Sequence, residues 1–165
     1  MIDIFSLSVE ELALKIKDAQ ISSVEVCEKY IERINKFEKE VKAWAYFDKK
    51  ILLEKASEAD EYRRSGKPVG SLHGVPIAVK DIVGTVDMPT ECGTVIRKGK
   101  SYSQNAEIID LLHAAGAIVM GKTATSELAY LGPSKTTNPH DYSRTPGGSS
   151  SGSAASVASL MAPLS

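Results

Sequence analysis

Residues 145–165 constrain the fold of this chain most, because they carry no charged side chain and yet are not strongly apolar. The segment begins with glycines and serines and continues with Ala154, Ala155, Val157 and Ala158 at helical spacing. Richness in glycine and serine often marks a flexible linker, but the alanines and valine that follow favour a core element. We therefore expect a buried helix after a Gly/Ser loop, with small side chains that let neighbouring backbones approach closely.

The first third of the chain is rich in charge and is predicted to be helical. Two Ser-x-x-Glu patterns, at residues 8–11 and 22–25, match the capping box with which many helices begin. Apolar residues follow both patterns at helical spacing, which indicates two amphipathic helices. A third helix is expected from Asp48 to Gly66, because glycine there suits a left-handed helix end. Residues 41–47 are β-branched and aromatic, which favours either a strand or an extended connector.

The middle of the chain has the pattern of a parallel α/β layer. Residues 74–80 form a short apolar run after a glycine, which is typical of a buried strand, and this strand ends at Lys80. Residues 105–115 have helical spacing, and residues 117–120 are again apolar and short enough for a strand. A strand, a helix and a strand in this order favour parallel pairing.

Length and composition fit one unit of the α/β class. At 165 residues the chain suits a single domain, mainly helical over residues 1–70 and α/β over residues 71–165, with part of a mostly parallel sheet flanked by helices. Its 20 basic and 21 acidic residues give a net charge of −1, so we expect no direct contact with nucleic acid or with a membrane. An acidic N-terminus and the lack of a long apolar run favour the cytoplasm. Cys27 and Cys92 are too few for a disulfide framework, and Cys27 lies on an apolar helical stripe.

The Gly/Ser segment at residues 147–153 fits two common loop types poorly. A glycine-rich loop before a helix can hold phosphate, but the Gly-Lys-Ser/Thr ending of a P-loop is missing. Residues 148–152 match the G-x-S-x-G nucleophile elbow, which would make Ser150 a nucleophile. That elbow needs a strand before it and a histidine after it, and the sequence offers neither, so we interpret the match as accidental. Ser151 and Ser153 are expected to start the helix and to pack.

The remaining candidate residues are scattered. His73, His113 and His140 are too far apart in sequence for a metal motif, so we expect no metal and no cofactor. His113 is expected on a helix face, and the other two histidines are expected in loops. Asp81 could orient Lys80, and a role in capping a turn or helix is about equally expected.

Three motifs, in order along the chain, resemble those of the amidase signature family. Gly-Val-Pro-Ile-Ala-Val-Lys-Asp at residues 74–81 resembles the lysine motif of this family. Thr-Pro-Gly-Gly-Ser-Ser-Ser-Gly-Ser-Ala-Ala at residues 145–155 resembles its Gly/Ser-rich signature, and residues 116–123 resemble the element between the two. The resemblance extends from about His73 to the last residue. The helical first third is compatible with the family but is not diagnostic of it.

The resemblance implies a catalytic triad of two serines and a lysine. Lys80 corresponds to the catalytic lysine, Ser149 to the bridging serine, and Ser150 to a neighbouring serine that supports the hydrogen bonds of the lysine. A lysine accepts a proton only when it is neutral, so this role needs a pKa well below the ordinary value, which burial can supply. A hydroxyl group both donates and accepts, so Ser149 can pass its proton to Lys80 while it takes the proton of a nucleophile.

The resemblance also implies a third residue, a nucleophilic serine in a second Gly-Gly-Ser-type loop a couple of dozen positions beyond Ser149. Ser165 follows Ala-Pro-Leu rather than a glycine pair, so no nucleophile is assigned within the chain. Members of the family are considerably longer than this sequence. The chain is therefore expected to be an N-terminal fragment that holds two triad positions and is inactive alone.

Three functions stay open at this point. The first is hydrolysis of a small-molecule amide through a seryl ester. The second is the glutaminase (A) subunit of a tRNA-dependent amidotransferase, which shares the signature, although residues 130–141 look more like those of a free-standing amidase. The third is non-catalytic: a truncated remnant or split piece that associates with a complementary chain or a second copy, because an incomplete sheet exposes an apolar edge.

Overall fold

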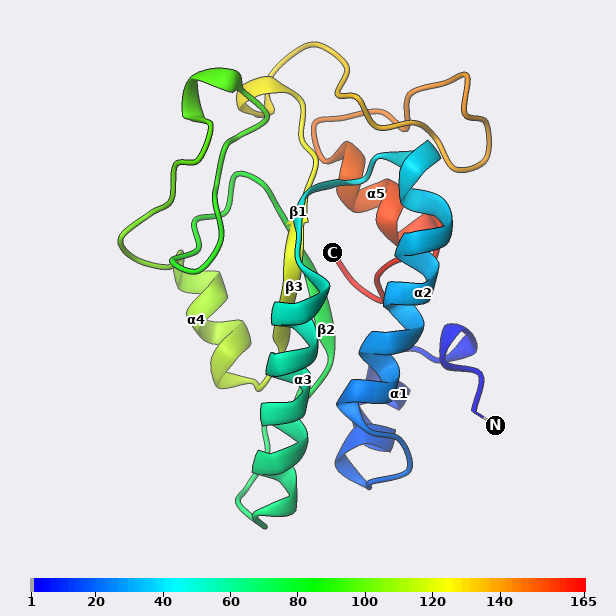
Figure 1. Ribbon diagram of the computed structural model, residues 1–165, viewed down its shortest axis with the longest axis vertical. Coiled ribbons are helices and arrows are strands. Elements are labelled where there is room, and N and C mark those ends of the chain that lie inside the picture. The colour runs from blue at the N-terminus through cyan, green and yellow to red at the C-terminus, as the bar shows by residue number, and fades with distance from the viewer. Residues whose placement is uncertain (1) are drawn as a thin grey trace.

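The computed structural model describes residues 2–165, which form helices around a small sheet (Figure 1). The helices are α1 (Val9–Lys17), α2 (Ser23–Val41), α3 (Lys49–Arg64), α4 (Glu107–Ala114) and α5 (Ser151–Ala158). The strands are β1 (Trp44–Phe47), β2 (Pro76–Lys80) and β3 (Ile118–Thr123). Short 3-10 turns at Ile4–Ser6, Val95–Arg97 and Glu127–Ala129 lie in the connections. The α/β class predicted from the sequence is confirmed.

The sheet joins its strands in the order β1-β3-β2. β2 and β3 are parallel, with Lys80 opposite Thr123 at their carboxyl ends, as the strand–helix–strand pattern predicts. β1 runs antiparallel to β3, so residues 44–47 of the segment for which the sequence allowed a strand or a connector form a strand, while Val41 ends α2. The sheet is therefore mixed. Its central strand, β3, is parallel to β2 at one edge and antiparallel to β1 at the other.

Local signals in the sequence account for the helix ends. The hydroxyl of Ser8 accepts a hydrogen bond from the N–H of Glu11, and that of Ser22 accepts one from the N–H of Glu25. Both glutamates bond back to the cap, so both predicted capping boxes are present. Gly66, just beyond the end of α3, has the positive φ of 75° that the sequence predicted.

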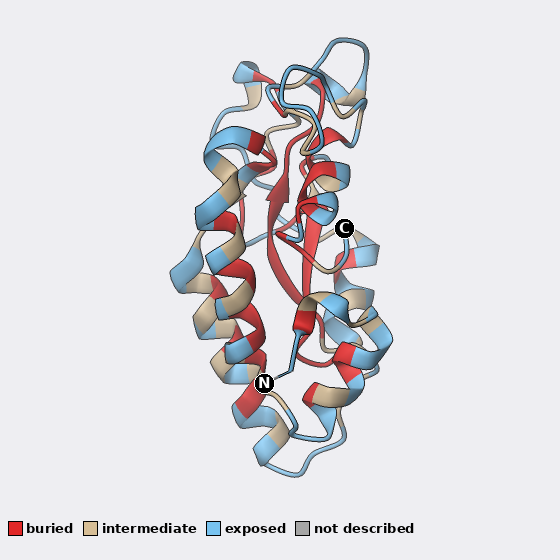
Figure 2. Cartoon of the chain, turned by 90° about the vertical axis from the view of Figure 1, so that its right-hand side faces the viewer, coloured by how far each residue is buried: buried red, intermediate tan, exposed pale blue. Residues whose placement is uncertain are grey.

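Two apolar clusters pack against the sheet. The larger lies among α1, α2, α3, α5 and the strands, and it includes Leu12, Ile31, Leu52 and Met120. Cys27 belongs to this cluster and is fully buried, as predicted, so burial raises the pKa of its thiol to about 12. The smaller cluster, around Val79, Met88, Ile109 and Val119, lies under α4. Figure 1 shows α4 on one side of the sheet and α2 with α5 on the other, and Figure 2 shows the strands as the buried centre.

The helix expected after the Gly/Ser loop is α5, but it is buried along one side only. Its buried residues are Ser151, Gly152, Ala155 and Ser156. Its exposed residues are Ala154, Val157 and Ala158. The expectation of a buried helix is met on one side only, because α5 meets all three strands through a single stripe of small residues and nothing among residues 2–165 covers its outer side.

The carboxyl ends of β2 and β3 lie at the same edge of the sheet. Residues 81–106 follow β2 and residues 124–150 follow β3, and Figure 1 shows both connections at this end of the molecule, in green and in yellow to orange. Ligands bind at this edge in many α/β sheets, because the connections there leave a crevice. As far as residues 2–165 are concerned, no helix has both the length and the apolar character of a membrane span.

Candidate active site

Lys80 and Ser149, the two catalytic residues that the resemblance implies, lie in contact. Lys80 is the last residue of β2, and Ser149 comes two positions before the start of α5. Nζ of Lys80 donates a hydrogen bond to Oγ of Ser149 at 2.6 Å, across 69 residues of sequence. Both residues are partly buried, and the Gly148–Ser149 peptide bond is cis. The fold therefore brings the lysine motif and the Gly/Ser motif together.

Backbone contacts hold the Gly/Ser segment against the segment that follows β3. The N–H of Ser126 donates to the carbonyl of Ser149 at 3.1 Å, and the N–H of Gly152 donates to the carbonyl of Ala124 at 2.9 Å. A Cβ at position 152 would lie 2.3 Å from the backbone nitrogen of Ala124 and 2.3 Å from the carbonyl oxygen of Ala43. Glycine is the residue type that permits this approach.

Three of the four serines of the motif have side-chain hydrogen-bond partners. Ser151 pairs with Ser134 at 2.6 Å between hydroxyl oxygens, and Ser153 pairs with Thr123 at 2.7 Å. These contacts agree with the packing role predicted for both serines. Ser150 is exposed, and no hydrogen bond of its hydroxyl group is found among the described residues 2–165. The role of Ser150 in supporting Lys80 stays a prediction.

The surroundings of Lys80 make its ammonium group easier to deprotonate than that of an exposed lysine. Burial lowers the pKa of Lys80, because an ammonium group loses hydration when protein replaces water around it. Within residues 2–165 no carboxylate pairs with its ammonium group, whose one hydrogen-bond partner is the hydroxyl of Ser149. A hydroxyl can accept from an ammonium group or donate to an amine, so this pair can hold the proton on either atom.

Asp81 does not contact Lys80. Its carboxylate accepts hydrogen bonds from the N–H groups of Glu91 at 3.1 Å and Gly93 at 3.4 Å, and it lies 3.8 Å from the ammonium group of Lys122. The expectation that Asp81 orients Lys80 was therefore wrong, whereas a role in capping a turn agrees with its two backbone partners. Successive side chains of an extended chain point to opposite faces, so a residue directly after Lys80 faces away from the site.

Lys122 is a buried charged residue that the sequence did not single out. It is fully buried in β3, where its ammonium group donates to the carbonyl of Val83 at 2.8 Å and to the hydroxyl of Thr90. Thr123 is the register partner of Lys80, and Lys122 precedes it, so Lys122 and Lys80 point to opposite faces of the sheet. A charged residue inside an apolar strand was the signal available in the sequence.

A surface pocket of about 620 Å³ opens beside Ser149. Its lining includes Ser126, Tyr130, Leu131, Pro133, Gly147 and Gly148. The pocket therefore combines backbone of the Gly/Ser loop with apolar side chains of the segment after β3. This combination leaves room for a small organic group next to the Lys80–Ser149 pair.

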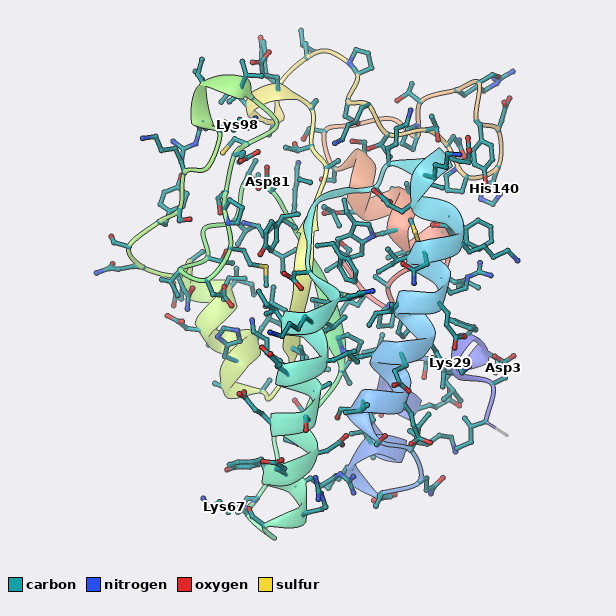
Figure 3. All side chains as sticks on the ribbon, in the orientation of Figure 1. Asp3, Lys29, Lys67, Asp81, Lys98 and His140 are labelled. Carbon is teal, nitrogen blue, oxygen red and sulfur yellow. The ribbon has the colours of Figure 1, made fainter. Side chains whose placement is uncertain are left out.

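The histidines do not gather at this site. His73 is buried in a turn, where its Nε2 lies 2.9 Å from the carbonyl oxygen of Ala59, while His113 lies on α4 as predicted. His140 is exposed in a turn, and Figure 3 shows it far from Asp81 at the other side of the molecule. Across residues 2–165 no group of three or more His, Cys, Asp or Glu side chains is placed to hold a metal ion.

The fold and the site define an α/β protein in which a lysine at a strand end meets a serine of a Gly/Ser-rich loop at the carboxyl edge of the sheet. The chain belongs to the amidase family, whose family model, Amidase, matches residues 25–165.

Relatives and solved structures agree with this family. The chain is 39% identical to the A subunit of glutamyl-tRNA(Gln) amidotransferase from Salinispora arenicola, over all of this chain and 35% of that protein. It is 40% identical to the corresponding protein from Rhodococcus erythropolis, over 99% of this chain and 35% of that protein. The native peptide amidase of Stenotrophomonas maltophilia superposes with a TM-score of 0.88 at 32% identity, over 95% of this chain and 35% of that one. The chain thus spans about a third of the length of these proteins.

Proposed function

We propose that this chain supplies the proton relay of an enzyme that transfers the acyl group of a small-molecule amide. The observation that carries the proposal is the hydrogen bond of 2.6 Å between Lys80 and Ser149, the two residues that match the catalytic lysine and the bridging serine. The match of the family model over residues 25–165 supports it.

In this mechanism neutral Lys80 accepts the proton of Ser149 while Ser149 accepts the proton of a nucleophilic serine hydroxyl. The nucleophile oxygen then attacks the amide carbonyl carbon, and the carbon–nitrogen bond breaks as the proton returns through Ser149 to the leaving amine. Water hydrolyses the resulting seryl ester through the same two residues. The lowered pKa of Lys80 supports its part, because only the neutral amine can accept a proton.

We place the nucleophile outside the chain described here. The relatives are about three times as long as the matched region, since this chain covers 35% of them. Ser149 receives its hydrogen bond from Lys80, and no acceptor for its own hydroxyl proton is found among residues 2–165. A further serine hydroxyl or a substrate atom can therefore meet Ser149 from the pocket side. By this proposal the 165 residues alone do not turn over amides.

A second candidate function is that of the glutaminase component of a tRNA-dependent amidotransferase. The identity of 39–40% to the A subunits of two such enzymes favours it. The superposition on peptide amidase, with a TM-score of 0.88, favours a free-standing amidase instead. The two differ in their partners, because a glutaminase component works within a complex. Hydrolysis of glutamine only in the presence of a co-purifying protein would identify the glutaminase.

The test of the proposal is the hydrolysis of a simple aryl amide by a polypeptide that continues this chain through the nucleophile loop. Lys80→Ala should lower kcat by about 10²–10⁴-fold, the usual contribution of a general base. Lys49→Ala is the matched control, because Lys49 is exposed at the start of α3, away from the site. Turnover of the Lys80→Ala protein at the wild-type rate would refute the assignment.

A further inference from the structure

Lys80 and Ser149 belong to a closed ring of contacts that passes through two further hydroxyl groups. Lys80 is opposite Thr123 in the register of β2 and β3. Oγ1 of Thr123 lies 2.7 Å from Oγ of Ser153, in the first turn of α5. Ser149 precedes α5 and accepts the hydrogen bond of Lys80 at 2.6 Å, which closes the ring. The lysine strand and the serine helix are thus tied to each other through β3.

Within residues 2–165 the hydroxyl pair is the one hydrogen bond that joins α5 to a residue of a strand. The start of α5 is also held by two bonds to the carbonyl of Ala124, from the N–H of Gly152 at 2.9 Å and from the hydroxyl of Ser151 at 3.4 Å, and the helix packs against all three strands. Two bonds to one carbonyl fix the helix start, and the bond of Ser153 adds a directional contact that opposes rotation about that point. The N–H of Ser126 holds the carbonyl of Ser149, so the rotation of α5 bears on the direction of the Ser149 side chain relative to the end of β2.

Packing alone does not explain these hydroxyl groups. Thr123 is fully buried and Ser153 is partly buried. Valine has the branched shape of threonine and alanine is close in size to serine, so an apolar pair would occupy much the same space. A buried hydroxyl that lacks a partner is costly, so the two groups depend on each other. The hydrogen bond between them fixes their relative orientation, whereas an apolar contact does not.

We propose that Thr123 and Ser153 are positioning residues that hold Ser149 at hydrogen-bond distance from Lys80. The inference rests on the proposed function, because it concerns the geometry of that proton relay. Proton transfer needs heavy atoms within about 2.6–3.2 Å, and a displacement of about 1 Å can cost about 10²-fold in rate. Without the bridge we expect α5 to turn enough to move Oγ of Ser149 away from Lys80, which lets water reach the ammonium group.

The test follows the titration of Lys80 in the 165-residue chain by competitive labelling with acetic anhydride across a series of pH values. The midpoint of the labelling profile reports the pKa of Lys80, and the exposed Lys49 is the internal reference. In the wild-type chain the Lys80 midpoint should lie below that of Lys49, because burial lowers the pKa of Lys80. Ser153→Ala and Thr123→Val should each move it upward, towards that of Lys49.

Two further variants separate positioning from general stability. Thr123→Ser keeps the hydroxyl group and should keep the wild-type midpoint. Ser156→Ala removes another buried hydroxyl of α5, which bonds only to the backbone carbonyl of Ser153 within the helix, and should also leave the midpoint unchanged. The double variant of Thr123→Val and Ser153→Ala should shift the midpoint no further than either single change, because both remove one bond.

The outcomes are distinguishable from a failure of the proposed function. A wild-type Lys80 midpoint equal to that of Lys49 would overturn the relay itself, and this inference with it. A lowered wild-type midpoint that neither Ser153→Ala nor Thr123→Val changes would overturn the positioning role and leave the relay intact. An equal shift in the Ser156→Ala variant would also overturn the positioning role, because that hydroxyl does not reach the sheet.

Discussion

Two lysines on neighbouring strands have different surroundings, and these surroundings separate their roles. Lys122 is fully buried, donates to Val83 and Thr90, and faces the carboxylate of Asp81. Burial lowers the pKa of Lys122, but Asp81 opposes this shift, and every partner accepts from a charged ammonium group. The ammonium group of Lys80 has one hydrogen-bond partner, a hydroxyl, and no carboxylate among residues 2–165 pairs with it. Lys122 therefore ties the loop after β2 to β3, whereas the ammonium group of Lys80 contacts a hydroxyl group with which it can exchange a proton.

The residue-scale prediction concerns Lys122→Met, which keeps a long apolar side chain and removes the ammonium group. The carboxylate of Asp81 would then be buried without its cation, so we expect a loss of about 3–5 kcal/mol in the free energy of unfolding. Urea denaturation at neutral pH measures this loss. Asp81→Asn in the same chain should recover most of it, because the amide has no charge to bury. If the double variant is as unstable as Lys122→Met, the ion pair is not the cause.

The pH dependence of the Lys122→Met variant has a definite sign. Burial already raises the pKa of Asp81 in the wild-type chain, and loss of the nearby cation raises it further. Asp81 then keeps its proton to a higher pH in the folded state than in the unfolded state. Stability is therefore lost as pH rises from the unfolded pKa to the folded pKa of Asp81, and the Asp81→Asn double variant should not show this loss.

At the scale of elements, the site depends on how closely α5 approaches the strand ends. Gly152 lies against the backbone of Ala124 and Ala43, with no space for a Cβ atom. Glycine in a helix normally costs about 1 kcal/mol relative to alanine. Its presence here is therefore explained by the close packing and not by helix propensity. The Gly/Ser-rich composition thus serves a close contact between a helix and a sheet edge, and the linker interpretation does not apply.

The element-scale prediction is that Gly152→Ala destabilises the chain by about 1–3 kcal/mol, the usual cost of overpacking. An open helical position would respond in the opposite direction, since alanine favours helix. Gly148→Ala is the control, because the nearest atom to a Cβ there is the Ser126 hydroxyl oxygen at 3.9 Å. Chemical denaturation of both variants provides the comparison. A Gly152→Ala chain as stable as the wild type would show that α5 is not held as closely as described.

At the scale of the whole molecule, the chain holds a relay and a pocket but spans about a third of the length of its relatives. Its large exposed apolar residues include Val95, Ile96 and Leu131, on the connections that leave the carboxyl edge of the sheet. Their exposure agrees with the proposal that further polypeptide completes the site at this edge.

The prediction at this scale is that the purified 165-residue chain neither hydrolyses aryl amides nor reacts with a serine-directed fluorophosphonate. Lys80 and Ser149 can move a proton, but by our proposal the attacking hydroxyl and the oxyanion donors come from elsewhere, and each such donor contributes about 10²–10³-fold. Mass spectrometry of the treated chain detects labelling. Stoichiometric labelling of Ser149 or Ser150, with amide turnover that Lys80→Ala abolishes, would contradict the proposal that the site is incomplete.

Local structure and the positions of the motifs follow from short stretches of the amino-acid sequence. Capping boxes, the glycine at the end of α3 and the short apolar runs act over a few residues, so these helices and strands were predictable. The family resemblance implied that Lys80 meets Ser149, and the fold supplies the geometry of that contact. The bond between Thr123 and Ser153 and the burial of Lys122 against Asp81 became visible in the three-dimensional structure alone. These contacts join residues that are 30 or more positions apart. They depend on which strands pair, in which register, and on which face each side chain lies, and no local pattern encodes those choices.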